Sequence, residues 1–348
     1  MTRKRVFFTA PPGRMQADFW TAEARALADA LGFDVALNPH AGKPDEATWA
    51  GMLRGVDALM TTWGAPRLTA GVLAGADALR IVGHAAGSAA ELVSPELFRR
   101  GIRLVTANPV MAQSVAEWAL MMTLVGRRHL LDYAQFGTSR PLVWERREQA
   151  FDLAGATVAV WGWGDVAQRL VRMLKPVGPA RILVCDDFLT PAAAAAAAGV
   201  EKVAFDRLFR EGDTIHLLAA LTEKNLGRVG AAELAAICDG AVLINCGRAD
   251  VVQEAALLAE LRKNRFTAIL DVHFAEPPAA DDPIRNLPNV ILTPHCAGAS
   301  TRLDRYVLHV LREFDRFFAG KPLESEIGAE RAVNMTRAAL VGHGRRNA

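Results

Sequence analysis

The sequence is poor in cysteine and contains no motif that would use it. Cys185, Cys238, Cys246 and Cys296 lie far apart and share no CxxC spacing. Neither a disulfide framework nor a zinc site is indicated, so four reduced thiols are expected. His295 adjoins Cys296, but no further ligand pair stands at a suitable spacing. No metal is therefore expected.

An excess of one charge and long apolar runs are also missing. The 40 basic residues are balanced by 38 acidic ones, which leaves a net charge of +2. No basic block is long enough to follow a phosphate backbone, so nucleic acid is not an expected partner. The N-terminus begins with basic residues, but its apolar segment ends well short of a secretory signal or a membrane span. We therefore expect a cytoplasmic protein without membrane contact.

The composition is that of a globular protein, with 51% hydrophobic and 22% charged residues. A length of 348 residues suits two domains of about 150 residues each. Short apolar runs alternate with longer periodic segments, which predicts βαβ units around parallel sheets. The expected strands are residues 6–9, 34–37, 58–61, 80–82 and 102–105, followed by 157–161, 182–185, 214–217, 241–245, 269–272 and 290–292. These two sets predict two α/β lobes.

Three helical segments bear on how the lobes are joined. Residues 18–31 repeat apolar side chains at helical spacing and stop at Gly32. Residues 114–130 are almost wholly apolar, which suits a connector between lobes, a core helix or both. Residues 302–318 form an amphipathic pattern that could return the chain to the first lobe. The tail after Gly328 is weakly patterned and is expected either to pack on a partner or to fray.

A glycine turn follows the expected strand at residues 157–161. The turn is GWGDVA, residues 162–167, and a helical pattern comes directly after it. In a pyrophosphate site, Gly162 would allow the tight turn, Gly164 would let the backbone approach the ligand, and Ala167 would let the helix pack on the strand. Backbone N–H groups at the start of the helix would then face the phosphates.

An acidic residue stands where a dinucleotide site needs one. Asp186 ends the next expected strand, 22 residues beyond Gly164, close to the offset of about 20 at which a carboxylate meets the ribose 2′-hydroxyl. Such a carboxylate would repel a 2′-phosphate, which favours NAD over NADP. Asp186 could instead be an ordinary loop acid or cap, and the neighbouring Asp187 competes for the role.

Three further polar residues follow strands of the second set. Arg248, Glu276 and His295 come after the expected strands that end at residues 245, 272 and 292. Ligands bind at the carboxyl ends of parallel strands, so these loops should open toward the cofactor. Each residue alone also has a purely structural explanation. Arg248 could be a solvated arginine, Glu276 an acid in a turn, and His295 a hydrogen-bonded structural histidine. Together they suit acid–base catalysis by histidine, support by a carboxylate and binding of a substrate carboxylate by arginine.

The motifs that carry these residues resemble those of the D-isomer-specific 2-hydroxyacid dehydrogenases, which include glyoxylate, hydroxypyruvate and phosphoglycerate oxidoreductases. The similar segments are AVLINCGRADVVQEAALLAEL, DVHFAEPP and NLPNVILTPHCAGAS, and the likeness extends from about residue 50 to about residue 320. The resemblance implies catalysis by Arg248, Glu276 and His295 with NAD as cofactor. It also implies cofactor contacts at Gly162, Gly164, Asp165, Val166, Asp186, Cys246 and Asp271, with Asp271 near the nicotinamide amide.

The resemblance also implies an architecture. Two Rossmann-like, doubly wound parallel-sheet domains of the α/β class would have a cleft between them. A discontinuous substrate-binding domain would comprise residues 1–110 and 300–330, an NAD-binding domain residues 111–299, and a C-terminal tail residues 331–348. A homodimer would form largely through the NAD-binding domain.

The substrate loop departs from the family pattern. Residues 81–90 keep small side chains, but the glycines are shifted and the usual acid is missing. Gly87 and Ser88, together with Arg248, are the expected substrate contacts. Trp63 and His84 fall near strand ends, where they could line the pocket or simply pack.

Two functions follow from these features. The first is an NAD-dependent enzyme that transfers a hydride between nicotinamide and C2 of a small D-2-hydroxy acid or 2-keto acid. The alternative, suggested by the altered loop, is an NAD(H)-sensing binding or regulatory protein that retains the dehydrogenase fold.

Overall fold

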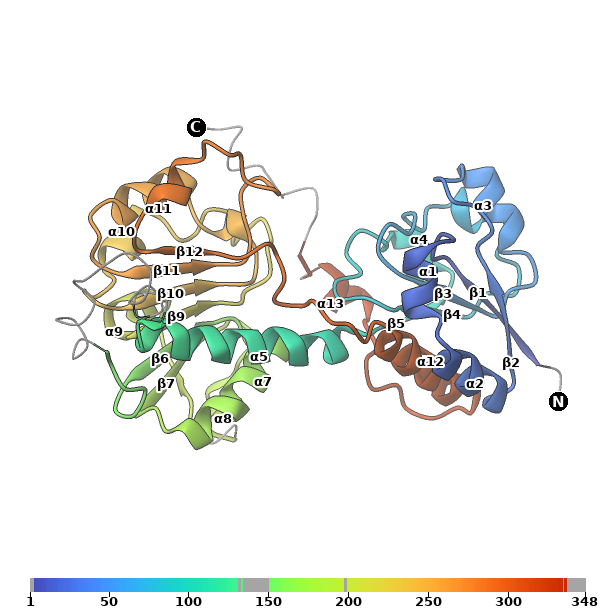
Figure 1. Cartoon of the computed structure of the whole chain (residues 1–348). Helices are drawn as coiled ribbons and strands as arrows, with labels where there is room; N and C mark the ends of the chain where they lie inside the picture. The colour runs from blue at the N-terminus through green and yellow to red at the C-terminus, as the bar shows by residue number, and fades with distance from the viewer. Residues whose placement is uncertain (1–2, 131–132, 134–149, 197–198, 334, 337–348) are drawn as a thin grey trace. The chain divides into compact units, whose positions relative to one another are not determined.

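A computed structural model describes residues 3–130, 133, 150–196, 199–333, 335 and 336. The chain divides into two compact units, each built on its own parallel sheet (Figure 1). The first unit extends to Ala112 and resumes at Ser300, and the second comprises Gln113–Ala299. Of the predicted tail, residues 334 and 337–348 lie outside the described residues. The two parallel α/β sheets confirm the predicted fold class.

The first unit contains a five-stranded sheet in the order β2-β1-β3-β4-β5. Its strands are β1 (Lys4–Phe8), β2 (Phe33–Leu37), β3 (Ala58–Thr61), β4 (Ile81–His84) and β5 (Arg103–Thr106). Its helices are α1 (Arg14–Phe19), α2 (Ala22–Ala30), α3 (Glu46–Met52), η1 (Val72–Gly75), α4 (Pro95–Arg99), α12 (Asp304–Phe318) and α13 (Ala329–Val333). Two separate apolar clusters, one including Tyr306 and Phe314 of α12 and the other Trp49 of α3, show that both faces of the sheet are covered.

The second unit contains a seven-stranded sheet in the order β12-β11-β10-β9-β6-β7-β8. Its strands are β6 (Thr157–Trp161), β7 (Arg181–Cys185), β8 (Glu201–Lys202), β9 (Thr214–Leu217), β10 (Val242–Asn245), β11 (Thr267–Leu270) and β12 (Val290–Leu292). Its helical segments are α7 (Asp165–Leu174), η3 (Lys175–Val177), α8 (Pro191–Ala196), α9 (Phe205–Glu211), α10 (Ala231–Ala235), η4 (Ala249–Val251), α11 (Glu254–Leu261) and η5 (Pro283–Asn286). The strand order reverses beside β6, and ligands of open α/β sheets bind at the carboxyl ends of the strands at such a point.

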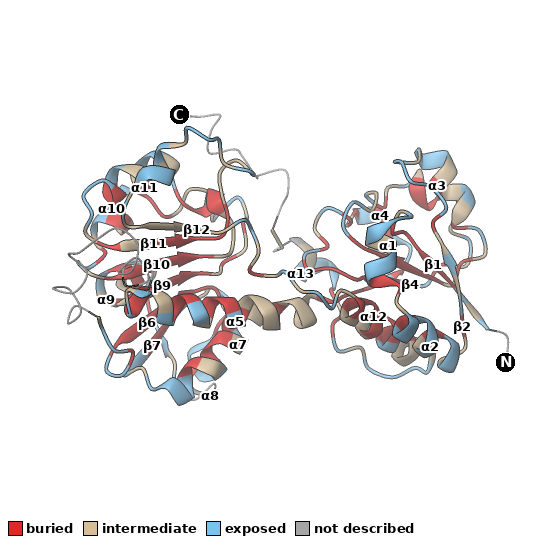
Figure 2. Ribbon diagram, in the orientation of Figure 1, coloured by how far each residue is buried: buried red, intermediate tan, exposed pale blue. Residues whose placement is uncertain are grey.

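The near-continuous apolar runs are explained by burial on both sheet faces, since the central strands are buried along their lengths (Figure 2). The long apolar helix α5 (Asn108–Arg127) begins in the first unit and continues into the second. A Cβ on its Gly126 would lie 2.6 Å from Val242 and 3.2 Å from Ile269. The helix therefore packs directly on β10 and β11 as part of the core. Within the described ranges, no helix is long and apolar enough to cross a membrane.

Three elements differ from the sequence-based expectation. The helix expected over residues 18–31 is divided into α1 and α2, because the Thr21 side chain accepts a hydrogen bond from the Ala24 N–H and starts a new helix. Strand β11 ends at Leu270, which places Asp271 just beyond it. The short strand β8 was missed, because its two residues are charged and exposed and carry no apolar signal.

Candidate functional site

The glycine turn between β6 and α7 has one closed side and one open side. Gly162 has a φ of 104°, and a Cβ on it would lie 2.8 Å from the Ala219 backbone nitrogen. Any side chain is therefore excluded there. A Cβ on Gly164, directly before α7, would meet no atom within 4 Å. The turn is open at the N-terminus of this ten-residue helix, which fits a bound pyrophosphate.

The first residues of α7 match the predicted arrangement. Asp165 and Val166 are partly exposed in the first turn of the helix, whereas Ala167 is fully buried against the sheet. Small size at Ala167 therefore lets the helix pack closely, as the GxGxxA pattern requires.

Asp186 lies directly after β7 and turns its carboxylate toward the glycine turn. One oxygen accepts a hydrogen bond from the Trp163 N–H at 2.9 Å, and the other accepts from the N–H groups of Phe188 at 2.8 Å and Leu189 at 3.1 Å. The residue is thus a cap, and its location beside the turn also fits a ribose contact. The neighbouring Asp187 instead pairs with Lys224 at 2.5 Å, and this hydrogen bond lowers the pKa of Asp187.

The turn after β10 carries Cys246 and Arg248. Asn245 shapes it, because its side chain donates to the Arg248 carbonyl and accepts from the Gly247 N–H, both at 3.0 Å. Arg248 is partly buried, and its Nη1 donates to the Gly247 carbonyl at 2.6 Å. Burial, with the negative charge of Asp271, raises the pKa of the Cys246 thiol to about 12. This thiol stays protonated at neutral pH and is unsuited to nucleophilic chemistry.

Asp271 fastens the end of β11 to the loop after β12. It is fully buried, and its Oδ1 accepts hydrogen bonds from Thr293 Oγ1 at 2.5 Å and from the Cys296 N–H at 2.8 Å. Its Oδ2 accepts from the Ala297 N–H at 2.8 Å. These bonds hold the loop on both sides of His295. The predicted contact of Asp271 with nicotinamide stays a prediction.

Glu276 and His295 are brought together by the structure. Glu276 Oε2 lies 2.8 Å from His295 Nδ1, and both side chains are nearly half exposed, at 42% and 47%. His295 has a φ of 52°, an uncommon conformation for a residue with a side chain. Because Nδ1 faces the carboxylate, Nε2 is the ring nitrogen left for a substrate.

A second histidine supports this pair and was missed in the sequence. The His273 N–H donates to Glu276 Oε1 at 3.2 Å, and its ring Nε2 donates to the Thr293 carbonyl at 2.8 Å. The only signal for His273 was its position just after an expected strand. Asn245 carried no such signal, because its role depends on a turn that only the folded chain reveals.

The three predicted catalytic residues follow three neighbouring strands. Arg248 comes after β10, Glu276 after β11 and His295 after β12, and these strands are parallel neighbours in the sheet. Their carboxyl ends therefore meet at one edge. The structure joins Glu276 to His295 through a hydrogen bond and places Arg248 in the adjacent loop.

The predicted substrate loop belongs to the first unit. Gly87 is buried, and a Cβ on it would lie 2.7 Å from Met111 Sδ, whereas Ser88 is exposed. His84 is 5% exposed and lies beneath the loop, with its Nδ1 2.9 Å from Thr61 Oγ1 and a further hydrogen bond to the Ser88 backbone. Burial lowers the pKa of His84 to about 4. The ring is therefore neutral and supports the loop from below.

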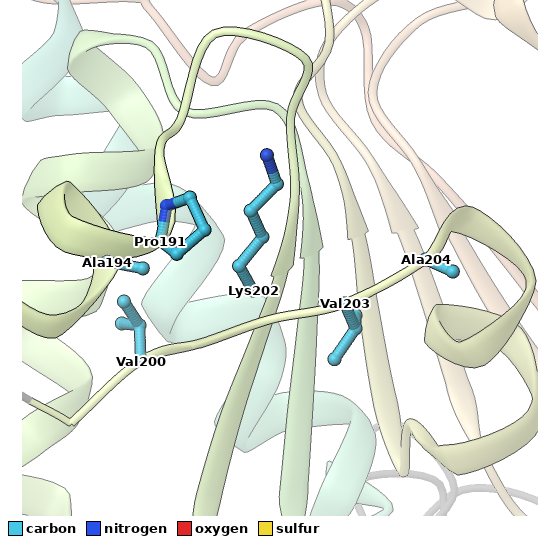
Figure 3. A pocket seen from close by; sticks show the side chains of 6 residues that line it. All are labelled: Pro191, Ala194, Val200, Lys202, Val203 and Ala204. Carbon is cyan, nitrogen blue, oxygen red and sulfur yellow. The ribbon is translucent and has the colours of Figure 1, made fainter.

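A surface pocket of about 490 Å³ lies beside β8. Its lining consists of Pro191, Ala194, Val200, Lys202, Val203 and Ala204 (Figure 3). The amine of Lys202 donates to the Leu189 carbonyl at 2.5 Å, and no predicted site residue contributes to the lining. Across the described residues, no group of three or more His, Cys, Asp and Glu side chains could hold a metal ion.

Comparison with known families identifies the second unit. Residues 119–297, just over half of the chain, match the model described as D-isomer specific 2-hydroxyacid dehydrogenase, NAD binding domain. The matched range contains the glycine turn, Asp186 and all three predicted catalytic residues. It confirms the predicted family resemblance and NAD as the cofactor.

Individual relatives agree with this match. A D-3-phosphoglycerate dehydrogenase from Archaeoglobus fulgidus is 31% identical over 68% of this chain and 44% of its own length. A glyoxylate reductase from Korarchaeum cryptofilum is 28% identical over 77% of this chain and 81% of its own length. The crystal structure of a phosphoglycerate oxidoreductase from Rhizobium etli has a TM-score of 0.78 at 28% identity, covering 93% of this chain and 99% of its own. The chain spans about half the length of the phosphoglycerate dehydrogenases it matches.

Proposed function

We propose that this chain, which belongs to the D-isomer-specific 2-hydroxyacid dehydrogenase family, transfers a hydride between NAD and C2 of a small D-2-hydroxy acid or 2-keto acid. The observation that carries the proposal is the 2.8 Å pair of His295 and Glu276, at the sheet edge that also bears Arg248. We assign cofactor binding to the second unit and substrate-carboxylate binding partly to the loop of the first.

Reduction of a 2-keto acid requires a hydride at C2 and a proton at the keto oxygen. The bound reduced cofactor supplies the hydride. His295 donates the proton from Nε2, and in the oxidative direction it takes the hydroxyl proton back. Glu276 faces Nδ1 and so fixes the tautomer and the orientation of the ring. The buried carboxylate of Asp271 holds the histidine loop in position.

Binding of the substrate carboxylate falls to Arg248. A guanidinium offers a rigid fork of donors that matches a carboxylate, and its charge also polarises the adjacent carbonyl. Support for this role comes from Asn245, whose side chain accepts from the Gly247 N–H and donates to the Arg248 carbonyl and so fixes the backbone at Arg248. The expected contacts of Gly87 and Ser88 with the substrate stay a prediction.

Asp186 favours NAD over NADP in this proposal. A carboxylate offers about four acceptor positions, so its three backbone bonds leave capacity for a ribose hydroxyl. A 2′-phosphate at the same place would meet a negative charge and lose the hydroxyl donor.

A homodimer is proposed from family membership. Supporting it, α5 carries two large apolar side chains that remain accessible, Met121 at 47% and Leu124 at 38% exposure. Burial of this face against a second copy would remove apolar surface from water. Sedimentation of the intact chain measures this assembly.

Oxidation of NADH with a panel of keto acids tests the proposed function. Glyoxylate, hydroxypyruvate, pyruvate and bulkier aryl keto acids are each incubated with the chain and NADH, and absorbance is followed. We expect loss of NADH with at least one acid, matched by an equal amount of the corresponding 2-hydroxy acid, in the D configuration where C2 is chiral. If NADH binds but none of the keto acids causes its oxidation, the proposed enzymatic activity is refuted and a dinucleotide-sensing protein is favoured.

A further inference from the structure

The Glu276–His295 pair spans two loops of the second unit. Glu276 lies in the loop after β11, and His295 lies in the loop after β12. Both side chains are nearly half exposed, so packing by itself leaves each of them room to move. The bonds that join the two loops therefore decide whether the pair keeps its 2.8 Å contact.

Thr293 is the residue at which the loop after β12 is fastened. Its N–H donates to the Leu270 carbonyl at 3.0 Å, and its Oγ1 donates to Asp271 Oδ1 at 2.5 Å. The carbonyl of Thr293 accepts from the His295 N–H at 2.9 Å, which closes a three-residue turn around Pro294. The position of this carbonyl thus sets where the backbone of His295 begins.

His295 follows this turn in a conformation that needs support. Its φ of 52° is left-handed, which costs free energy for a residue with a side chain and persists only where the surroundings over-determine it. After His295, the backbone is held by Asp271, which accepts from the N–H groups of Cys296 and Ala297 at 2.8 Å. Before His295, it is held by the Thr293 carbonyl.

The ring of His273 supplies a second donor to that carbonyl. His273 Nε2 lies 2.8 Å from the Thr293 oxygen, and because a carbonyl only accepts, Nε2 carries the proton in this contact. The backbone N–H of His273 donates to Glu276 Oε1 at 3.2 Å. One residue thus holds the Glu276 carboxylate through its backbone and the turn before His295 through its side chain.

We propose that His273 is a positioning residue for proton transfer. Its imidazole holds the turn before His295, so that His295 keeps Nδ1 on Glu276 and offers Nε2 to the substrate. The inference rests on the proposed function and adds a residue to its mechanism. Because His273 is not expected to contact substrate or cofactor, loss of its ring should slow proton transfer and leave the binding of both unchanged.

The test compares two amide variants that differ by one methylene group, using the best substrate in the keto acid panel. In His273→Gln the amide nitrogen is as many bonds from Cα as Nε2 is, and it can still donate to the Thr293 carbonyl. In His273→Asn it is one bond short. We expect His273→Asn to lower kcat by about 10- to 100-fold, the upper value being the cost of a misplacement of about 1 Å, with KM and NADH affinity as in the wild type. His273→Gln should keep most of the wild-type kcat.

His273→Phe is a second variant without a ring donor and should lose kcat as His273→Asn does, and thermal unfolding verifies that each variant is folded. Wild-type kcat in both, or an equal loss in His273→Gln, would overturn the positioning role and leave the proposed function standing.

If the wild type turns over no keto acid, crystal structures of the wild type and His273→Asn decide. Separation of Glu276 Oε2 from His295 Nδ1 beyond a hydrogen-bond reach of about 3.2 Å in the variant alone supports the positioning role. A contact kept within that reach in the variant overturns it.

Discussion

His295→Ala is expected to lower kcat by about 10²- to 10⁴-fold, the contribution of a positioned general acid, while NADH binds as in the wild type. The reason is that in the proposed mechanism the imidazole supplies the proton, whereas His295 is not among the expected cofactor contacts. Steady-state turnover of the best substrate in the keto acid panel, with NADH affinity from fluorescence titration, measures both effects.

His40→Ala is the matched control, because His40 is an exposed histidine of the first unit with no part in the proposed chemistry. Glu276→Gln is expected to give an intermediate loss of kcat. It keeps an oxygen near His295 Nδ1 that can still orient the ring but removes the negative charge facing it, so the loss of kcat should be smaller than in His295→Ala. Full turnover in His295→Ala would refute the assignment of the general acid.

Arg248→Ala is expected to lower kcat/KM by about 30- to 5,000-fold. Truncating one partner of a hydrogen-bonded charge pair costs roughly 2 to 5 kcal/mol, and each 1.36 kcal/mol is about tenfold in rate. The kcat/KM of Arg248→Lys should fall between those of the wild type and Arg248→Ala, because lysine keeps the positive charge but loses the bidentate fork. Initial rates over a range of keto acid concentrations measure the effect.

The control for Arg248 is Arg262→Ala, which removes an exposed guanidinium beyond α11. NADH affinity should be unchanged in all three arginine variants. A wild-type KM in Arg248→Ala, together with retained kcat, would show that another group binds the substrate carboxylate.

Much of the fold could be predicted because its signals are local. Parallel strands that are buried on both faces appear in the sequence as short apolar runs. The strands Ala58–Thr61 and Thr157–Trp161 could therefore be predicted at their observed bounds. The glycine turn was also predictable, since the strand, turn and helix are contiguous in the sequence. The helix break at Thr21 was not, because the apolar periodicity continues through it.

The support of the site could not be predicted from sequence. Asp271 binds backbone groups at Cys296 and Ala297, 25 and 26 residues further along the chain, and nothing in the spacing specifies which carboxylate closes which loop. His84 was a candidate for the pocket lining, but it ends a central strand and is buried beneath the loop. Such roles depend on contacts between loops that only the folded sheet brings together.

We propose that one guanidinium and one imidazole at this sheet edge, those of Arg248 and His295, act on the same substrate. The most direct measurement is a crystal structure of the chain with NADH and oxamate, an unreactive analogue of a 2-keto acid. We expect Arg248 at the analogue's carboxylate and His295 Nε2 at its carbonyl oxygen, each within about 3.2 Å. An analogue bound beside the nicotinamide with both side chains directed elsewhere would contradict the account.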